Sequence, residues 1–270
     1  DQLFAEDLWT FDPRVGKFRT DAMHYTNVAR VLKSKLAATQ VDQVPAWKPL
    51  GRLAASHTDA AGKRVELRPD QRRAAEAWLE SRRGCVVMPT GTGKTEVALH
   101  LMQTIAESTL IVAPVRDLMY QWHRRILART GIDAGILGDG VYRVSPLTVT
   151  TYDSAYLHMA RLGNQFSLVV FDECHHLPGP ARQDAARMCA APFRLGLTAT
   201  PERSDGRHVL LASLIGATVY RQKLKDARGT TLADYDLQRI PVYLSDQERE
   251  RYDQLSETIR QYMYQRRQDD

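Results

Sequence analysis

The sequence predicts an α/β fold in which a parallel sheet is flanked by helices, together with a small α+β domain at the N-terminus. Between residues 67 and 220, short apolar runs alternate with helical patterns, which is typical of parallel strands covered on both faces. The glycine-rich segment Met88–Thr95 joins the first run to an amphipathic stretch, so a strand, a loop and a helix follow one another directly. We therefore expect an open sheet whose functional loops lie at the carboxyl ends of its strands.

Composition limits the classes of protein to which the chain can belong. Its 270 residues are enough for one large domain or two smaller ones, and the net charge of +5 makes a polyanion such as nucleic acid a plausible partner. No apolar run approaches the roughly eighteen residues of a membrane span, and the first residues lack the basic start and apolar core of a signal peptide. The sequence thus favours a cytoplasmic protein without a membrane partner. Three cysteines at no metal-ligand spacing are expected to be buried, reduced thiols.

The N-terminal region, residues 1–62, is predicted to be a separate accessory domain. It carries its own aromatic and basic residues, and from Tyr25 to Leu36 apolar residues recur at helical spacing. We expect one amphipathic helix packed on short strands. The small and polar segment Ala54–Gly62 is predicted to be a linker to the next domain.

Residues 63–220 carry the alternating pattern of the sheet domain. A helix is predicted over Pro69–Ser81, with proline in its first turn and Gly84 beyond its end, and another over Glu96–Ile105. The predicted strands are Cys85–Met88, Leu110–Ala113, Leu147–Thr151, Leu168–Phe171 and Arg194–Leu197.

The sheet pattern ends after Tyr220, and residues 221–270 are predicted to be a linker and a helix. The linker holds one short extended piece, Arg239–Leu244. The helix is expected over Ser245–Arg267, capped by Ser245 and with acidic residues in its first turns.

The loop between the first strand and its helix is suited to binding phosphate. Gly91 and Gly93 let the backbone approach an anion, Lys94 can reach the β and γ phosphates, and the Thr95 hydroxyl can ligate Mg²⁺. The segment spells a P-loop in which Met88 replaces the usual first glycine. The alternative is a glycine turn with a surface lysine. The predicted nucleotide contacts in this loop are Thr90, Gly91, Thr92, Gly93, Lys94 and Thr95.

Two carboxylates follow the strand Leu168–Phe171. At the strand end beside the P-loop, Asp172 can hold Mg²⁺ and Glu173 can orient and deprotonate the attacking water. We place His176 as a polar link from these carboxylates to the hydroxyls of Thr198 and Thr200, which are expected to couple nucleotide state to neighbouring contacts. An acidic strand end followed by a turn is the structural alternative.

A further nucleotide contact is predicted at the start of the helix that precedes the P-loop. The amide of Gln71 has the donor and the acceptor needed to read an adenine edge, and Arg68 can contact base or phosphate. A helix start with no ligand is the other interpretation.

Taken together and in order, these motifs resemble motifs Q, I, Ia, Ib, II and III of superfamily 2 helicases, and most of all the XPB family in its archaeal and bacterial form. The likeness covers residues 65 to 245 well and Phe11 to Tyr25 more loosely. The motifs that carry it are Arg68-Pro69-Asp70-Gln71, Gly91-Thr92-Gly93-Lys94-Thr95, Ala113-Pro114 with Gln121-Trp122, Thr151-Tyr152-Asp153-Ser154-Ala155-Tyr156, Asp172-Glu173-Cys174-His175-His176 and Pro192-Phe193-Arg194-Leu195-Gly196-Leu197-Thr198-Ala199-Thr200-Pro201.

The resemblance implies a RecA-like lobe that uses ATP and Mg²⁺ to translocate on or unwind DNA in repair. It also implies a damage-recognition-like role for residues 1–62 and a Bax-type nuclease as a possible partner. Arg203 and Asp205 match the ends of the family's Arg-Glu-Asp motif, with Ser204 in place of the glutamate. The residues expected to contact DNA are Arg116, Gln121, Thr151 and Tyr152.

Nothing after residue 220 resembles a second RecA-like lobe, which the family uses to complete ATP hydrolysis. We therefore expect weak ATP binding and slow turnover from this chain alone, with the second lobe as its natural complement. A DNA- or nuclease-binding module in which the ATPase lobe serves as a scaffold is the alternative function.

Overall fold

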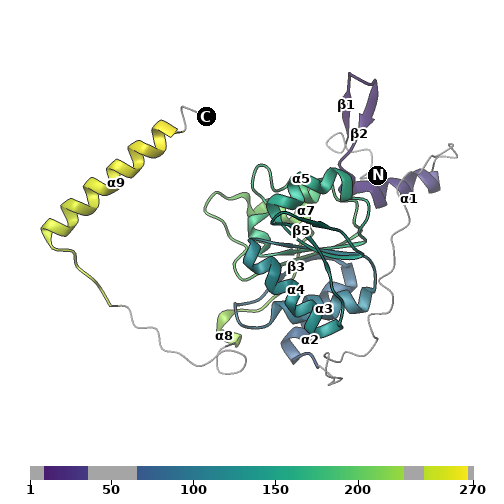
Figure 1. Cartoon of the computed structure of the whole chain (residues 1–270), viewed down its shortest axis with the longest axis horizontal. Coiled ribbons are helices and arrows are strands. Elements are labelled where there is room, and N and C mark those ends of the chain that lie inside the picture. The colour runs from purple at the N-terminus through teal and green to yellow at the C-terminus, as the bar shows by residue number, and fades with distance from the viewer. Residues whose placement is uncertain (1–8, 36–65, 228–239, 267–270) are drawn as a thin grey trace. The chain divides into compact units, whose positions relative to one another are not determined.

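The computed structural model describes residues 9–35, 66–227 and 240–266. The chain divides into two compact units, residues 1–233 and 234–270, and each is considered by itself. The larger unit holds a mixed sheet with helices on both sides (Figure 1).

An eight-stranded sheet forms the centre of the larger unit, in the order β10-β3-β9-β8-β4-β7-β5-β6. Neighbouring strands run parallel except for the antiparallel pair β5 and β6. The five predicted strands are confirmed, and three more join them at the two edges. The strands are β3 (Arg83–Val87), β4 (Thr109–Ala113), β5 (Gly135–Gly138), β6 (Val141–Arg143), β7 (Leu147–Thr151), β8 (Leu168–Asp172), β9 (Phe193–Thr198) and β10 (Thr218–Arg221).

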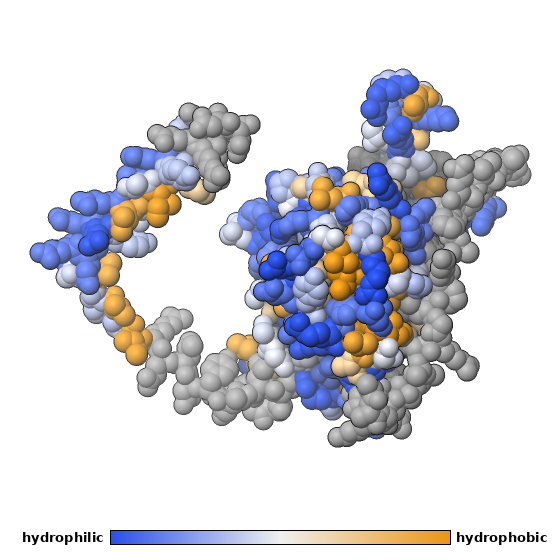
Figure 2. Space-filling model, in the orientation of Figure 1, coloured by the Kyte–Doolittle hydropathy of each residue, from blue (hydrophilic) through white to orange (hydrophobic). Residues whose placement is uncertain are grey.

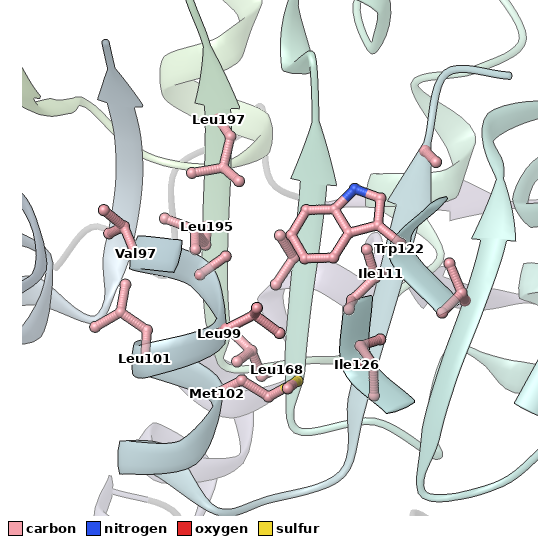
Figure 3. Close-up of a cluster of buried hydrophobic side chains, with 14 of the residues drawn as sticks. Val97, Leu99, Leu101, Met102, Ile111, Trp122, Ile126, Leu168, Leu195 and Leu197 are labelled. Atoms are coloured by element: carbon pink, nitrogen blue, oxygen red, sulfur yellow. The ribbon is translucent and has the colours of Figure 1, made fainter. Parts of the chain in front are cut away.

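Alternating residues of the strands pack into two separate hydrophobic cores, one on each face of the sheet. Ile111 of β4 packs with α2, α3 and α4 on one face, whereas Leu110 and Val112 pack with α5, α6 and α7 on the other. Figure 3 shows the first core, where Leu99 and Met102 of α3 lie near Leu168. None of the described helices combines the length and apolar character that crossing a membrane requires. The helices are α2 (Pro69–Ser81), α3 (Lys94–Ile105), α4 (Arg116–Thr130), α5 (Tyr152–Leu162), α6 (Asp184–Arg187) and α7 (Leu211–Leu214).

The lobe continues beyond the predicted boundary at residue 220. The Gln222 N–H donates to the Val87 carbonyl oxygen at 2.9 Å, and its side-chain amide lies 3.4 Å from Asp70 Oδ2. Ala227, in the short helix α8 (Leu224–Ala227), is fully buried. Strand β10 escaped the sequence analysis because it is short and lies at a sheet edge, where its residues are half exposed and not a continuous apolar run.

The described part of the N-terminal region holds the expected short strands and helix, while the packing of the helix on the strands stays a prediction. Strands β1 (Thr10–Asp12) and β2 (Lys17–Arg19) pair antiparallel, and α1 (Tyr25–Lys35) follows the 3-10 helix η3 (Ala22–His24). Met23 packs against the α5 side of the core, and Asp21 Oδ2 lies 3.7 Å from Arg187 Nε. Residues 9–35 therefore contact the lobe. The proposed linker 54–62 lies outside the described residues, so an independent domain 1–62 stays a prediction.

Helix α9 (Asp246–Arg266) begins where the sequence predicts, after Ser245. The Glu248 carboxylate accepts from the Ser245 backbone N–H at 2.9 Å, and the Glu248 N–H donates to the Ser245 hydroxyl at 3.4 Å, which completes a capping box. Leu255, Ile259 and Met263 are exposed at four-residue spacing, and Figure 2 shows hydrophobic and hydrophilic residues side by side along this helix. Residues 240–244, the described part of the predicted extended piece, join no sheet, and that piece stays a prediction.

A glycine in the middle of β9 allows β3, the turn after β8 and the segment after α7 to pack closely against it. A Cβ on Gly196 would lie 2.9 Å from Cys85 Sγ, 2.9 Å from Ile215 Cδ1 and 3.0 Å from Cys174 Sγ. We expect Gly196→Ala to lower the free energy of unfolding by about 1–3 kcal/mol through overpacking. Urea denaturation measures this, and adding Cys174→Ala should restore part of the loss. A single variant as stable as the wild type contradicts this packing.

Candidate functional site

The glycine loop between β3 and α3 has the shape of an anion cradle. Gly91 and Gly93 have φ of 84° and 81°, which only glycine adopts without strain, and Gly93 caps the N-terminus of α3. The Thr92 side chain is buried and its hydroxyl donates to the Pro89 carbonyl oxygen at 2.6 Å. Thr90 and Gly91 are exposed at the loop tip. The loop thus presents its backbone outward at the start of a helix, where anions are favoured.

Lys94 folds back over this loop and is buried. Its Nζ donates to the Met88 carbonyl oxygen at 3.2 Å and lies 3.9 Å from Glu173 Oε1. The ammonium group therefore stands between the loop and the carboxylates at the end of β8. Thr95, one residue further on, is half-buried and brings a hydroxyl oxygen to the same helix start.

The start of α2 braces the loop from the side. Both Arg68 Nη2 and Gln71 Nε2 donate to the Thr92 carbonyl oxygen, the latter at 3.0 Å. Gln71 Oε1 also accepts from the Arg68 N–H at 3.0 Å. These bonds use one N–H and one lone pair of the Gln71 amide, so one of each remains for an adenine edge. The adenine contact of Arg68 and Gln71 stays a prediction.

Asp172 and Glu173 lie at the carboxyl end of β8, as the sequence predicts. Asp172 Oδ2 accepts from Trp122 Nε1 at 2.7 Å, and its Oδ1 accepts from the Glu173 N–H at 3.0 Å. Burial raises the pKa of Asp172, and the Trp122 bond opposes this. Glu173 has a left-handed backbone, with φ of 45°, which is uncommon for a residue with a side chain and turns the chain sharply after the strand. Such strain is found at functional sites.

His175, rather than His176, links Glu173 to the end of β9. Its Nδ1 lies 2.9 Å from Thr198 Oγ1 and 3.4 Å from Glu173 Oε2, while Thr198 Oγ1 also reaches Glu173 Oε2 at 3.4 Å. The link assigned to His176 is wrong, because the tight turn after Glu173 directs the first histidine to Thr198 and leaves the His176 ring 6.4 Å from that of Tyr152. Burial lowers the pKa of both histidines.

The other residues expected to couple the site to its surroundings divide into two groups. Thr200 bonds the link through its backbone only: its N–H donates to Thr198 Oγ1 and its carbonyl oxygen accepts from that hydroxyl, both at 3.2 Å. Arg203 and Asp205 form a two-bond ion pair at 2.9 and 2.6 Å, and Arg203 Nη1 donates to the His175 carbonyl oxygen at 2.6 Å. The Arg203 guanidinium accordingly holds the pKa of Asp205 far below its usual range.

Three of the four residues predicted to contact DNA have a polar side chain that is exposed or partly exposed. Arg116 is exposed and donates to Asp139 Oδ1 at 3.2 Å, Gln121 is exposed on α4, and Thr151 caps α5 by accepting from the Ser154 N–H at 3.2 Å. Thr151 is the last residue of β7 and pairs with Ala113, the last residue of the parallel strand β4, which Arg116 follows. Both residues therefore lie at the carboxyl ends of the strands.

The direct DNA contact predicted for Tyr152 is wrong. This side chain is fully buried, and its hydroxyl donates to the Asp172 carbonyl oxygen at 3.0 Å. Burial raises the pKa of the phenol well above its usual value. Tyr152 thus supports the end of β8 from the core, a role that its motif position at the strand end did not reveal.

Sequence reasoning also missed Trp122 and His175 as members of the site. Trp122 was noticed only as part of a motif on the helix after β4, and nothing in its spacing tells that the indole N–H reaches a carboxylate fifty residues away. For His175 the order of two adjacent histidines gave no means of choosing between them. Contacts of this kind depend on the turn that follows a strand.

The assembled site joins an anion cradle, a lysine, a hydroxyl and two carboxylates at the ends of β3 and β8. Thr95 and Asp172 supply hard oxygen donors, the kind that Mg²⁺ prefers. The Glu173 carboxylate has one oxygen 3.9 Å from Lys94 Nζ and the other 3.4 Å from His175 Nδ1, and a carboxylate is a group that can accept a proton.

Comparisons with known proteins agree with this arrangement. Residues 64–203, just over half of the chain, match the family described as type III restriction enzyme, res subunit. The chain is 44% identical over 200 residues to the DNA 3′-5′ translocase XPB2 of Sulfurisphaera tokodaii, covering 74% of this chain and 46% of that protein. It is 34% identical to the DNA 3′-5′ helicase XPB of Mycobacterium tuberculosis, covering 69% of this chain and 36% of that protein.

The fold has a counterpart among solved structures. The UvsW helicase of bacteriophage T4 superposes with a TM-score of 0.54 at 18% identity, over 77% of this chain and 80% of that one. The chain spans less than half the length of the two XPB relatives. On its fold, its motifs and these matches, the chain belongs to the type III restriction enzyme res subunit family and, among superfamily 2 helicases, to the XPB group.

Proposed function

We propose that this chain is the ATP-binding lobe of an XPB-type DNA helicase or translocase that couples ATP hydrolysis to movement on DNA in repair. The observation that carries the proposal is the meeting of Lys94, Asp172 and Glu173 beside the phosphate cradle. The similarity to proteins named as DNA 3′-5′ helicases and translocases supports the same function.

The phosphate groups of ATP would lie against the cradle. The backbone N–H groups that follow Gly91 would bind them, Lys94 would exchange the Met88 carbonyl for a phosphate oxygen, and Thr95 and Asp172 would hold Mg²⁺. The bound ion would neutralise the charge that develops on the transferred phosphate. A hydroxyl and a carboxylate at this place fit such an ion.

Glu173 would orient the attacking water and accept its proton on the carboxylate. Its Oε2 lies 3.4 Å from both His175 Nδ1 and Thr198 Oγ1, so the carboxylate is held from the side of β9. Arg203 holds the same histidine segment through its carbonyl oxygen. A movement of the segment that carries Arg203 would therefore shift His175 and, through it, the Glu173 carboxylate.

DNA would contact Arg116 and Thr151 at the carboxyl ends of the strands, and Gln121 on the exposed surface of α4. Backbone phosphate is the expected partner there, because arginine, amide and hydroxyl groups position a strand without reading its sequence. A second RecA-like lobe and a Bax-type nuclease stay predictions as partners.

Asp139 competes with DNA for Arg116. Replacing Asp139 by asparagine should raise the affinity for single-stranded DNA a few-fold, because Arg116 is then free to bind a phosphate. The slope of the logarithm of the binding constant against the logarithm of the salt concentration should become steeper by about one released counterion. Asparagine tolerates the left-handed backbone of this residue, φ 53°. Fluorescence anisotropy across a salt series measures both quantities. Glu80→Gln removes the same charge from an exposed residue of α2 and should change them less, so equal effects would contradict the competition.

The function is tested by the ATPase rate of this chain with and without single-stranded DNA, together with Mg²⁺-dependent binding of a fluorescent ATP analogue. We expect nucleotide binding that Lys94→Ala abolishes and slow turnover that DNA increases. Absence of nucleotide binding would overturn the proposal. Binding and turnover that DNA leaves unchanged would favour the scaffold function instead.

A further inference from the structure

Apart from the adjacent residue Glu173, Trp122 is the one group seen to bond the Asp172 carboxylate in the described part of the chain. Its Nε1–H donates to Oδ2 at 2.7 Å, a short distance typical of a bond to an ionised acceptor. The Glu173 N–H donates to Oδ1 at 3.0 Å. Each oxygen therefore has one donor, which fixes the plane of the carboxylate and leaves a lone pair on each oxygen for another ligand.

The indole itself has little freedom to move. Trp122 is 3% exposed and belongs to the core between α4 and the sheet. In Figure 3 its ring lies beside Ile111, with the nitrogen on the side away from Ile126 and Met102. The apolar part of the ring is thus held by packing, while its only polar atom faces the strand end.

Helix α4, which carries this indole, is tied to its surroundings at three further points. Near its start Tyr120 donates to Asp139 Oδ2 at 3.0 Å, next to Trp122 the His123 Nε2 lies 2.9 Å from Asp133 Oδ1, and near its end Arg129 pairs with Glu96 in the first turn of α3. The last of these joins α4 to the helix that begins with Lys94 and Thr95. Helix α4 is therefore joined to α3, which carries Lys94 and Thr95, and through Trp122 to the end of β8, which carries Asp172.

We propose that Trp122 is a positioning residue that orients the Asp172 carboxylate for a divalent cation bound with nucleotide. The inference rests on the proposed function, since it assigns Asp172 to that cation. Partners that orient a metal ligand commonly change metal affinity 10–100-fold when removed. Trp122→Phe keeps an aromatic ring in the core and removes the donor.

The matched control is Trp78→Phe. Trp78 is also fully buried on a helix, and its Nε1–H donates to the Arg194 carbonyl oxygen at 3.0 Å, remote from the carboxylates in sequence and bonding. Both variants lose the same atoms and one buried hydrogen bond. Thermal unfolding without nucleotide shows whether both variants are folded.

The experiment measures the Mg²⁺ concentration that half-saturates binding of a fluorescent, non-hydrolysable ATP analogue to the wild type and both variants. We expect about a tenfold or greater increase for Trp122→Phe and about a twofold change or less for Trp78→Phe, which removes the same donor away from the carboxylates. Equal values for the two variants would overturn the positioning role. A wild type without Mg²⁺-dependent binding would instead overturn the proposed function.

A second measurement uses the wild-type chain alone. The indole N–H signal of Trp122 in an NMR spectrum, identified by its loss in Trp122→Phe, should shift on addition of Mg²⁺ and the analogue, while the Trp78 signal stays in place. If Trp122→Phe fails to fold, the signal is identified instead as the indole signal that persists in each of Trp9→Phe, Trp47→Phe and Trp78→Phe. An unchanged Trp122 signal under conditions where binding is saturated would overturn the proposal.

Discussion

Replacing Glu173 by glutamine is expected to lower the ATP turnover of this chain by about 100-fold or more while nucleotide affinity stays within about twofold. The amide keeps the size and hydrogen-bonding reach of the carboxylate, so the cradle and Lys94 are undisturbed. It cannot accept the proton of the attacking water. The loss should therefore fall on the chemical step alone.

Turnover is best followed under single-turnover conditions over hours, because one lobe without an arginine from a second lobe is expected to be slow. Glu76→Gln is a suitable control, since it makes the same change on an exposed residue of α2. If Glu173→Gln hydrolyses ATP as fast as Glu76→Gln, another group is the base. If it fails to bind nucleotide, Glu173 holds Lys94 in place and has no separate chemical role.

The strands of the sheet, and the position of the site residues at the ends of those strands, could be predicted because both depend on local sequence patterns. Buried parallel strands are continuous apolar runs, and all five such runs became strands. Asp172 and Glu173 follow one of them directly, so their place at the carboxyl edge follows from strand direction. Strands β5 and β6 were not predicted, since four and three residues with glycine at two positions give too little pattern.

Contacts made by side chains across the sheet could not be predicted in this way. Tyr152 and Thr151 are adjacent and stand at the same strand end, yet the first faces the core and the second caps a helix. Which one is exposed depends on the rotation of α5 as it leaves β7. The same holds for His175 and His176, whose directions are set by the left-handed turn at Glu173.

Arg194→Met is expected to lower the free energy of unfolding by about 3–5 kcal/mol, the largest stability change we predict. Arg194 is completely buried in β9, and no carboxylate of the described residues pairs with it. Its guanidinium instead donates to the carbonyl oxygens of Ala186, Cys189, Ala191 and Leu214, which come from two segments beside the sheet. Burial lowers the pKa of this guanidinium to about 10, which still leaves it charged at neutral pH.

Methionine would fill much of the same space but remove the donor that the guanidinium supplies to these four carbonyl groups. Ala186 still accepts from the Cys189 N–H at 3.2 Å, whereas the other three are left without a donor seen in the described part of the chain. Each such group costs about 1–3 kcal/mol before the chain relaxes. Arg161→Met, on the exposed face of α5, removes the same charge and should change stability by about 0.5 kcal/mol or less. Urea denaturation of both variants measures the difference. Equal midpoints would mean that these carbonyl groups find other donors. A selective loss for Arg194→Met would show that β9, which places Thr198 beside Glu173, is held by the arginine four residues earlier.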